Sequence, residues 1–140
     1  MIKILYETTA VATGGRDGRA RTIDGSFEVK LATPKELGGN GDGNNPEQLF
    51  ASGYSACFLG AMKFTAGRGG HAKVPSDASV TATVGIGPRD DEGFGLKVGL
   101  VISLPGVEKD AAEALIAAAD KVCPYSHATR GNIEVTLTLA

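Results

Sequence analysis

Two cysteines are the residues of this chain whose type and setting could do chemistry. Cys57 lies within the apolar stretch QLFASGYSACFLGAMKF, and Cys123 follows in KVCPYS, 66 residues later. A pair of cysteines can be inert packing, a structural bridge, a metal site or a redox couple. Only the thiolate form of cysteine is a good nucleophile or metal ligand. The choice among these four therefore depends on the elements that position each sulfur.

The size and charge of the chain narrow the possible functions. We expect one domain spanning residues 1–140, because a chain of 140 residues can bury a substantial core. The net charge is −2, and the Lys and Arg residues are scattered rather than gathered in a basic run. Neither nucleic acid nor an anionic membrane is therefore an expected partner.

The sequence also gives an expectation for the cellular compartment. No apolar stretch reaches the roughly 18 residues that are needed to span a bilayer. The N-terminus MIKILYETTA has too few apolar residues for the core of a signal peptide. We therefore expect a cytoplasmic protein. Stable structural disulfides are rare in that compartment, and cysteine pairs there tend to be catalytic, redox-sensing or metal-binding.

Glycine is abundant, with 20 residues, many of them in the segments TGGRDGR and ELGGNGDGNNPE. The second segment lacks the Gly and Glu spacing of a calcium-binding loop. Neither segment is followed by the Lys-Ser/Thr pair of a phosphate-binding loop. We interpret these glycines as tight turns.

Four segments alternate apolar and polar residues, which is typical of strands with one buried face. They are SFEVKLA, SVTATVGIG, GLKVGLVISL and NIEVTLTL. The dipeptide Asp24-Gly25 is typical of a hairpin turn, and it would join a strand around residues 19–23 to the strand that contains Phe27. Residues 2–11 are a further, less regular, predicted strand.

The sequence NNPEQLF predicts the start of a long helix. Asn45 is the expected N-cap, Pro46 suits the first helical position, and Gln48 suits the capping box. The helix is predicted to run to about Ala66, and it is apolar nearly all round, so we expect it to be central and buried. Helical spacing places on one face Phe50, Gly53, Cys57, Gly60 and Phe64.

A second helix is predicted from about Glu108 to Val122. Pro124 disfavours helix at the preceding residue and so places Cys123 at or just beyond the C-terminus of this helix. The expected inner stripe consists of Ala111, Ala114, Leu115, Ala118 and Val122. These elements predict an α+β fold with mostly antiparallel strands and one central helix.

The two sulfurs are not equivalent in this arrangement. An ordinary thiol has a pKa of about 8.5, so activation requires a nearby positive charge. Cys57, in the middle of a helix, gains nothing from the helix dipole, and burial would raise its pKa. Cys123 faces the negative end of a helix dipole, which disfavours its thiolate. If either sulfur is a nucleophile, we expect Cys57, activated by an Arg that is distant in sequence, with Cys123 in a resolving role.

Several blocks of sequence resemble one known family. VATGGRDGR, KELGG, NPEQLFASGYSACF, VGIGP and VCPYSHATRGNIEV are together similar to the organic hydroperoxide resistance proteins, the Ohr branch of the Ohr/OsmC superfamily. The resemblance spans nearly the whole chain. It implies an OsmC-like fold in an intertwined homodimer, with mostly antiparallel sheets wrapped around a central buried helix. It also implies a thiol-dependent peroxidase that reduces alkyl and lipid hydroperoxides to alcohols.

The resemblance further implies a role for each of four residues. The thiolate of Cys57 would attack the hydroperoxide, and Cys123 would resolve the resulting sulfenic acid as an intramolecular disulfide. Arg16 would stabilise the thiolate, and Glu47 would orient Arg16. The implied reductant is dihydrolipoamide or a lipoylated protein, with no bound cofactor and no metal.

The sequence departs from the family at three positions. Asp120 stands where His is common, His127 where Asn is common, and Asn44 where Thr is common. None of these changes removes an implied catalytic role. Asp120 precedes Cys123 by three residues and could further disfavour its thiolate, which is compatible with the resolving role.

The spacing of Glu47 and Cys57 predicts how the site is assembled. The two residues are ten positions apart, so on one unbroken helix they are separated by about 15 Å along the axis. An Arg side chain could barely bridge that distance. We therefore predict that the Glu47 near a given Cys57 belongs to the partner chain. The two central helices would then cross antiparallel and approach closely at Gly53, Ala56 and Gly60.

Other interpretations stay open on the sequence alone. They are a peroxidase of the sister OsmC branch, a redox sensor or binding module that does not turn over, and an acyl-transfer enzyme. A metal site would have to use Cys57, Cys123, His71 and His127. Phe50 and Phe94 are candidate contacts for the alkyl tail of a substrate, and we expect Arg130 to bind helix or loop carbonyls.

Overall fold

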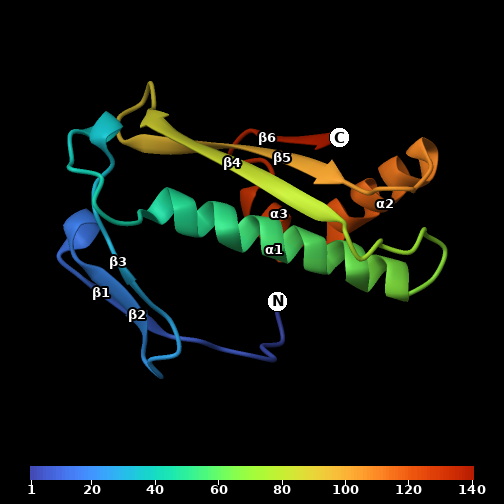
Figure 1. Cartoon of the computed structure of the whole chain (residues 1–140), viewed down its shortest axis with the longest axis horizontal. Helices are drawn as coiled ribbons and strands as arrows, with labels where there is room; N and C mark the ends of the chain where they lie inside the picture. The colour runs from blue at the N-terminus through green and yellow to red at the C-terminus, as the bar shows by residue number, and fades with distance from the viewer. The chain divides into compact units, whose positions relative to one another are not determined.

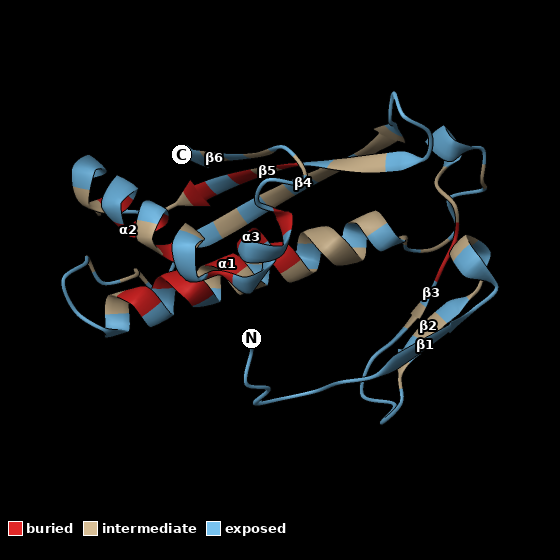
Figure 2. Cartoon of the chain, turned by 180° about the vertical axis from the view of Figure 1, so that it is seen from behind, coloured by how far each residue is buried: buried red, intermediate tan, exposed pale blue.

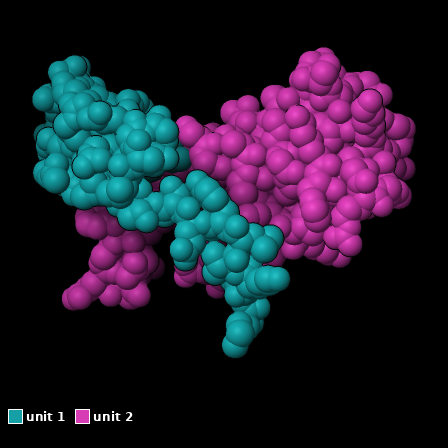
Figure 3. All heavy atoms as spheres, turned by 90° about the horizontal axis from the view of Figure 1, so that it is seen from below, with its two compact units in different colours: residues 1–49 teal, residues 50–140 magenta.

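The computed structural model describes residues 1–140, which form two compact units, Met1–Leu49 and Phe50–Ala140 (Figure 1, Figure 3). Each unit is described by itself. The expectation of a single domain over residues 1–140 stays a prediction. The mixture of helices and small sheets agrees with the predicted α+β class.

The first unit contains a three-stranded antiparallel sheet. Its strands are β1 (Ala10–Thr13), β2 (Arg19–Thr22) and β3 (Glu28–Lys30), in that order. The predicted strand over residues 2–11 is wrong for most of its length, because β1 begins only at Ala10 and the register with β2 covers only Ala10–Thr13. Residues 1–9 are exposed and not in a strand.

The turn between β2 and β3 confirms the predicted hairpin. Gly25 has a φ of 75°, a conformation that glycine adopts without strain. The Asp24 carboxylate accepts hydrogen bonds from the Ser26 backbone N–H at 3.0 Å and from the Thr22 hydroxyl at 2.7 Å. These bonds, that of Ser26 first, lower the pKa of Asp24 to about 2.

The second unit contains the other sheet. The strands β4 (Ser79–Pro88) and β5 (Phe94–Ser103) are antiparallel, and β6 (Val135–Leu139) pairs with β5 in parallel. Figure 1 shows this sheet along one side of helix α1 (Pro46–Gly67). All three strands match segments predicted from period-two alternation.

A single apolar core joins this sheet to the helices of the second unit. Val98, Leu100 and Ile102 of β5 have no exposed surface, and they pack in one cluster with Tyr54 and Phe58 of α1. Complete burial of a side chain of this size contributes about 1.5–3 kcal/mol. Apolar burial therefore fixes the position of α1 against the sheet, as the colouring in Figure 2 illustrates.

Helix α1 begins with the predicted capping box. The Asn45 N–H donates to Gln48 Oε1 at 3.1 Å, and the Gln48 N–H donates to Asn45 Oδ1 at 2.9 Å. These bonds satisfy backbone donors that have no partner inside the helix. The helix ends at Gly67, one residue beyond the predicted end.

The burial of α1 differs from the expectation of a helix buried all round. Its buried residues are Tyr54, Phe58, Ala61, Met62 and Thr65. Gly60 is exposed and Phe64 is 57% exposed. Within one chain α1 is thus the central helix of the core, but one of its faces is left open.

Helix α2 (Lys109–Val122) has the predicted extent but a different inner face. Glu108 is its N-cap, and the Glu108 carboxylate accepts from the N–H groups of Asp110 and Ala111. The buried residues are Ala112, Leu115, Ile116 and Ala119. Of the predicted stripe only Leu115 is buried. The prediction was wrong because alanines lie on every side of this helix, so the sequence does not show which face is apolar.

A third helix, α3 (Pro124–Thr129), was not predicted. It follows α2 directly, with Cys123 between the two. None of the helices has the combination of length and apolarity that is needed to cross a membrane.

Candidate active site

The structure brings the two cysteines into contact. Their Sγ atoms lie 3.9 Å apart, with the Cys123 thiol placed as a weak donor to Cys57. Both are free thiols. Cys123 has no exposed surface, whereas Cys57 is half-buried. The more accessible sulfur is therefore Cys57, which sequence reasoning also chose as the candidate nucleophile.

Cys123 occupies the junction of two helices. It is the C-cap of α2, as predicted, and its N–H donates to the Ala119 carbonyl at 2.9 Å. It is also the N-cap of α3, and its carbonyl accepts from the His127 N–H at 3.0 Å. The sulfur is thus attached to backbone that is bonded on both sides, which limits how far it can move.

Gly53 of α1 lies directly against Tyr125 of α3. A Cβ atom at Gly53 would be 2.8 Å from Tyr125 Oη and 3.1 Å from Cε2 of the same ring. The Cβ direction of Gly53 is therefore covered by α3 of the same chain, and the predicted approach of a partner helix at Gly53 concerns an assembly and stays a prediction. Gly60, in contrast, has no atom within 4 Å of an added Cβ.

The surroundings of Cys57 determine the sign of its pKa shift. Burial raises the pKa of the Cys57 thiol, and the neighbouring Cys123 sulfur raises it further. A hydrogen bond from the Tyr125 backbone opposes this rise. The sequence analysis did not anticipate that bond, because it depends on α3. The net direction is upward, so Cys57 still requires a cation from elsewhere to be a thiolate at neutral pH.

Arg16 and Glu47 form a two-point ion pair within the first unit. Arg16 Nη1 donates to Glu47 Oε2 at 2.8 Å, and Nη2 donates to Oε1 at 2.5 Å. The side chains are 34% and 13% exposed. The guanidinium hydrogen bonds lower the pKa of Glu47, and the same contact raises the pKa of Arg16. Both groups are therefore held in their charged forms.

The local backbone structure holds both residues of this ion pair in position. Glu47 is in the first turn of α1, where the helix dipole favours a negative charge. Arg16 is in the 3₁₀ turn Gly15–Asp17, which follows Gly14 at a φ of 75°. The Asp17 carboxylate accepts from the Thr33 N–H at 3.0 Å and so anchors the turn. The prediction that the Glu47 near a given Cys57 belongs to a partner chain concerns an assembly and stays a prediction.

An apolar cavity of about 360 Å³ adjoins Tyr125 in the second unit. Its lining residues are Phe50, Leu96, Tyr125, Ala128, Thr129, Asn132 and Ile133. Phe50, a candidate substrate contact, is among them. Phe94, the other candidate, is 67% exposed and does not line this cavity.

Arg130 binds the end of helix α2, as expected for a structural arginine. Its Nη2 donates to the Asp120 carbonyl at 2.8 Å and to Asp120 Oδ2 at 2.9 Å. The charge of Asp120 is thus paired with a guanidinium.

The four residues considered for a metal site do not form one. No three side chains among the His, Cys, Asp and Glu residues lie close enough together to hold a metal ion. His127 is an exposed residue of α3, and His71 is exposed beyond α1.

Comparison with known proteins shows the family of this chain. Residues 39–138 match the family model described as OsmC-like protein. The organic hydroperoxide resistance protein of Xanthomonas axonopodis pv. citri is 55% identical over 139 residues, which cover 99% of this chain and 96% of the relative. The chain belongs to the organic hydroperoxide resistance branch of the OsmC family. The family resemblance stated from sequence is thereby confirmed.

Solved structures of this branch share the fold. An organic hydroperoxide resistance protein from Legionella pneumophila matches with a TM-score of 0.92 and 45% identity, covering 99% of both chains. One from Elizabethkingia anophelis matches with a TM-score of 0.90 and 47% identity, also over 99% of both chains. The predicted OsmC-like fold is confirmed by these similarities.

Sequence reasoning missed the contribution of α3 to the site. The signal was available, since Pro124 directly after a helix end suits the first position of a new helix. The contact of Tyr125 with Gly53 had no such signal, because it depends on how α3 packs.

Proposed function

We propose that this chain is a thiol-dependent peroxidase that reduces organic hydroperoxides to alcohols. The observation that supports it most is the 3.9 Å separation of two free thiols, one half-buried and one buried. Membership of the organic hydroperoxide resistance branch supports the substrate class.

The first step is oxidation of Cys57. Its thiolate attacks one oxygen of the hydroperoxide, an S–O bond forms and the O–O bond breaks. The alkoxide leaves, takes up a proton and becomes the alcohol, while Cys57 becomes a sulfenic acid. Because burial raises the pKa of Cys57, the thiolate needs a cation. We assign that role to Arg16, which Glu47 orients through the two-point ion pair.

The second step is resolution by Cys123. Its sulfur attacks the sulfur of the Cys57 sulfenic acid, an S–S bond forms, and the hydroxyl leaves with the thiol proton as water. The reductant is then a dithiol of the lipoyl type, dihydrolipoamide or a lipoylated protein. It supplies two electrons and two protons, restores both thiols and leaves as its own disulfide. No bound cofactor takes part.

The apolar cavity beside Tyr125 supports organic substrates over hydrogen peroxide. A cavity lined by Phe50, Leu96 and Ile133 lowers the free energy of a bound alkyl chain by removing it from water. Hydrogen peroxide has no apolar surface to bury and gains nothing from these contacts.

The active form in this proposal is a homodimer in which the central helices cross antiparallel. The exposed Ala56 and Gly60 leave room on the open face of α1 for close approach of a partner helix. In that arrangement the ion pair of Arg16 and Glu47 from one chain acts on Cys57 of the other. The predicted cytoplasmic location suits this chemistry, since thiols are kept reduced there.

Stoichiometric oxidation followed by mass spectrometry tests the proposal. Cumene hydroperoxide should convert the two thiols into a Cys57–Cys123 disulfide, and Cys57→Ser should abolish peroxide consumption. Cys123→Ser should allow about one turnover and then stop as sulfenic or sulfinic acid. Turnover with dihydrolipoamide should exceed turnover with thioredoxin or glutathione. A protein that is oxidised once and does not turn over with dihydrolipoamide would be a redox sensor or binding module instead.

A further inference from the structure

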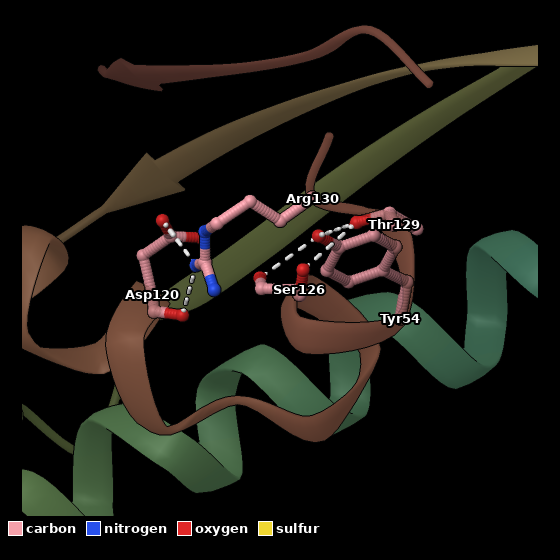
Figure 4. Close-up of polar contacts among 5 residues, drawn as sticks. All are labelled: Tyr54, Asp120, Ser126, Thr129 and Arg130. Carbon is pink, nitrogen blue, oxygen red and sulfur yellow. Dashed lines mark hydrogen bonds and ion pairs between the residues drawn. The ribbon is translucent and has the colours of Figure 1, made fainter. Parts of the chain in front are cut away.

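Helix α3, which directly follows Cys123, is hydrogen-bonded to α1 through a group of three hydroxyls (Figure 4). Tyr54 Oη lies 2.8 Å from Ser126 Oγ and 3.2 Å from Thr129 Oγ1. Thr129 Oγ1 in turn donates to the Ser126 carbonyl at 3.2 Å. All three residues are buried, with exposed fractions of 0%, 2% and 6%.

Every proton in this group can have an acceptor. Ser126 can donate to Tyr54, Tyr54 can donate to Thr129, and Thr129 donates to the Ser126 carbonyl. Loss of the Tyr54 hydroxyl would leave buried hydroxyls on α3 with fewer partners, which costs free energy because water does not reach them. The contact with α1 would then hold α3 less firmly.

A second contact, an ion pair, joins the end of α3 to α2. Arg130, at the end of α3, donates to both the carbonyl and the carboxylate of Asp120 in the last turn of α2. Cys123 lies between these two residues in the sequence. Figure 4 shows the Arg130 side chain reaching from the end of α3 to Asp120.

The contacts that hold α3 in place bear on the formation of the disulfide. The sulfurs must approach from 3.9 Å to a bond length of about 2.05 Å. During that approach the sulfenic acid is open to a second hydroperoxide, which would convert it to sulfinic acid. A resolving sulfur that is held close reacts faster than one on a mobile turn, because fewer orientations must be searched.

We propose that Tyr54 and the Asp120–Arg130 pair are positioning residues for the resolving step. Tyr54 is three residues before Cys57 on α1, so its hydroxyl ties α3 to the helical turn next to the peroxidatic sulfur. This inference rests on the proposed function and adds the groups that protect Cys57 from over-oxidation. In the step itself Cys123 and Cys57 form the S–S bond, and the sulfenic hydroxyl leaves as water with the Cys123 thiol proton.

A cavity of about 180 Å³ lies beside these groups. Its lining includes Tyr54, Asp120, Ser126 and Arg130, together with apolar residues of β6. Neither Cys57 nor Cys123 lines this cavity, so it does not lie between the two sulfurs.

The test is single-turnover oxidation of Tyr54→Phe by cumene hydroperoxide, with sulfenic acid, disulfide and sulfinic acid quantified by mass spectrometry. We expect the first oxidation to keep its rate. Disulfide closure should slow roughly three- to tenfold, the size of one lost hydrogen bond, and sulfinic acid at Cys57 should rise in proportion. Asp120→Asn, which keeps the carbonyl contact, should slow closure less.

Matched variants separate this effect from general damage. Tyr6→Phe removes an exposed tyrosine hydroxyl, and Asp91→Asn removes the carboxylate of the exposed Arg89 pair. Neither should change the ratio of disulfide to sulfinic acid. Ser126→Ala should reproduce the effect of Tyr54→Phe, and the double variant should be no slower than either single one, because the contact is shared.

The outcomes are distinguishable. Unchanged closure in both Tyr54→Phe and Ser126→Ala, or an equal slowing of oxidation and closure, would overturn the positioning role. If the unmodified protein forms no disulfide with cumene hydroperoxide, the proposed function itself fails.

Discussion

The sulfur atoms of Cys57 and Cys123 lie 3.9 Å apart, although 66 positions separate the two residues in the chain. The contact is made by the middle of α1 and the junction of α2 and α3. Apolar packing of these helices against β5 maintains it.

Replacement of Arg16 by Lys should strongly reduce peroxidase activity. Lysine keeps the charge but cannot make the two-point contact that Arg16 makes with Glu47. We expect kcat/KM for cumene hydroperoxide to fall about 10- to 100-fold, the size of one charge-assisted interaction. The matched control is Arg19→Lys, since Arg19 also binds a carboxylate, that of Glu28, on the surface. Equal losses in the two variants would contradict the assignment.

The ion pair also predicts a dependence of stability on pH. Since folding lowers the pKa of Glu47, the carboxylate stabilises the folded state at pH values above its unfolded pKa. This contribution is lost as the pH falls through the lowered folded value. We expect roughly 1 kcal/mol, because Arg16 is about one-third exposed and solvent screens the pair.

Urea unfolding of Glu47→Gln between neutral and acidic pH measures that contribution. The variant should be less stable than the unmodified protein near neutrality, and the difference should shrink in acid. Glu28→Gln, in an exposed pair, serves as the control and should show a smaller difference at neutrality. A difference for Glu47→Gln that grows in acid would have the wrong sign.

Gly53→Ala should not give the stabilisation that is usual for Gly-to-Ala changes inside helices. The gain in helix propensity is about 1 kcal/mol, but the added Cβ would lie 2.8 Å from Tyr125 Oη. Movement of the Tyr125 ring is resisted by its contacts with Phe50 and Tyr54 and should cost about 1–3 kcal/mol. Thermal unfolding should therefore show no gain or a loss. A clear rise in Tm would mean that α3 does not lie against Gly53.

Gly60→Leu should disrupt the proposed dimer while leaving the fold of one chain intact. Within one chain nothing lies within 4 Å of a Cβ at this position, so a larger side chain fits there. In a dimer with crossing central helices it would separate the two backbones. Light scattering should show a shift toward monomer and circular dichroism an unchanged helix content. An unchanged dimer would place the interface elsewhere on the chain.

Much of the fold could be predicted because its signals are local. Alternation predicted β4, β5 and β6, and the capping box predicted the start of α1 at Pro46. The predicted inner face of α2 was wrong, since six alanines lie within its Lys109–Val122 sequence and alanine fits either face. The strand predicted over residues 2–11 failed because apolar content alone does not supply a pairing partner.

The roles of the candidate site residues stay predictions, whereas some of the contacts among them could be predicted from the sequence and others could not. The pairing of Arg16 with Glu47 followed from family resemblance, and the structure contains it within one chain. Two hydrogen bonds were not predictable. They are the bond from the Tyr125 backbone to Cys57 and the bond between the hydroxyls of Tyr54 and Ser126. Both depend on how α3 packs, which no local pattern encodes.

Activation of Cys57 by Arg16 is tested most directly by the rate of Cys57 alkylation as a function of pH, measured in Cys123→Ser so that only one thiol reacts. If the Arg16 guanidinium stabilises the Cys57 thiolate, the half-maximal rate is expected at a pH below neutrality and is displaced upward in the Arg16→Lys, Cys123→Ser double variant. A half-maximal rate above the ordinary thiol value of about 8.5, unchanged by loss of the guanidinium, would contradict it.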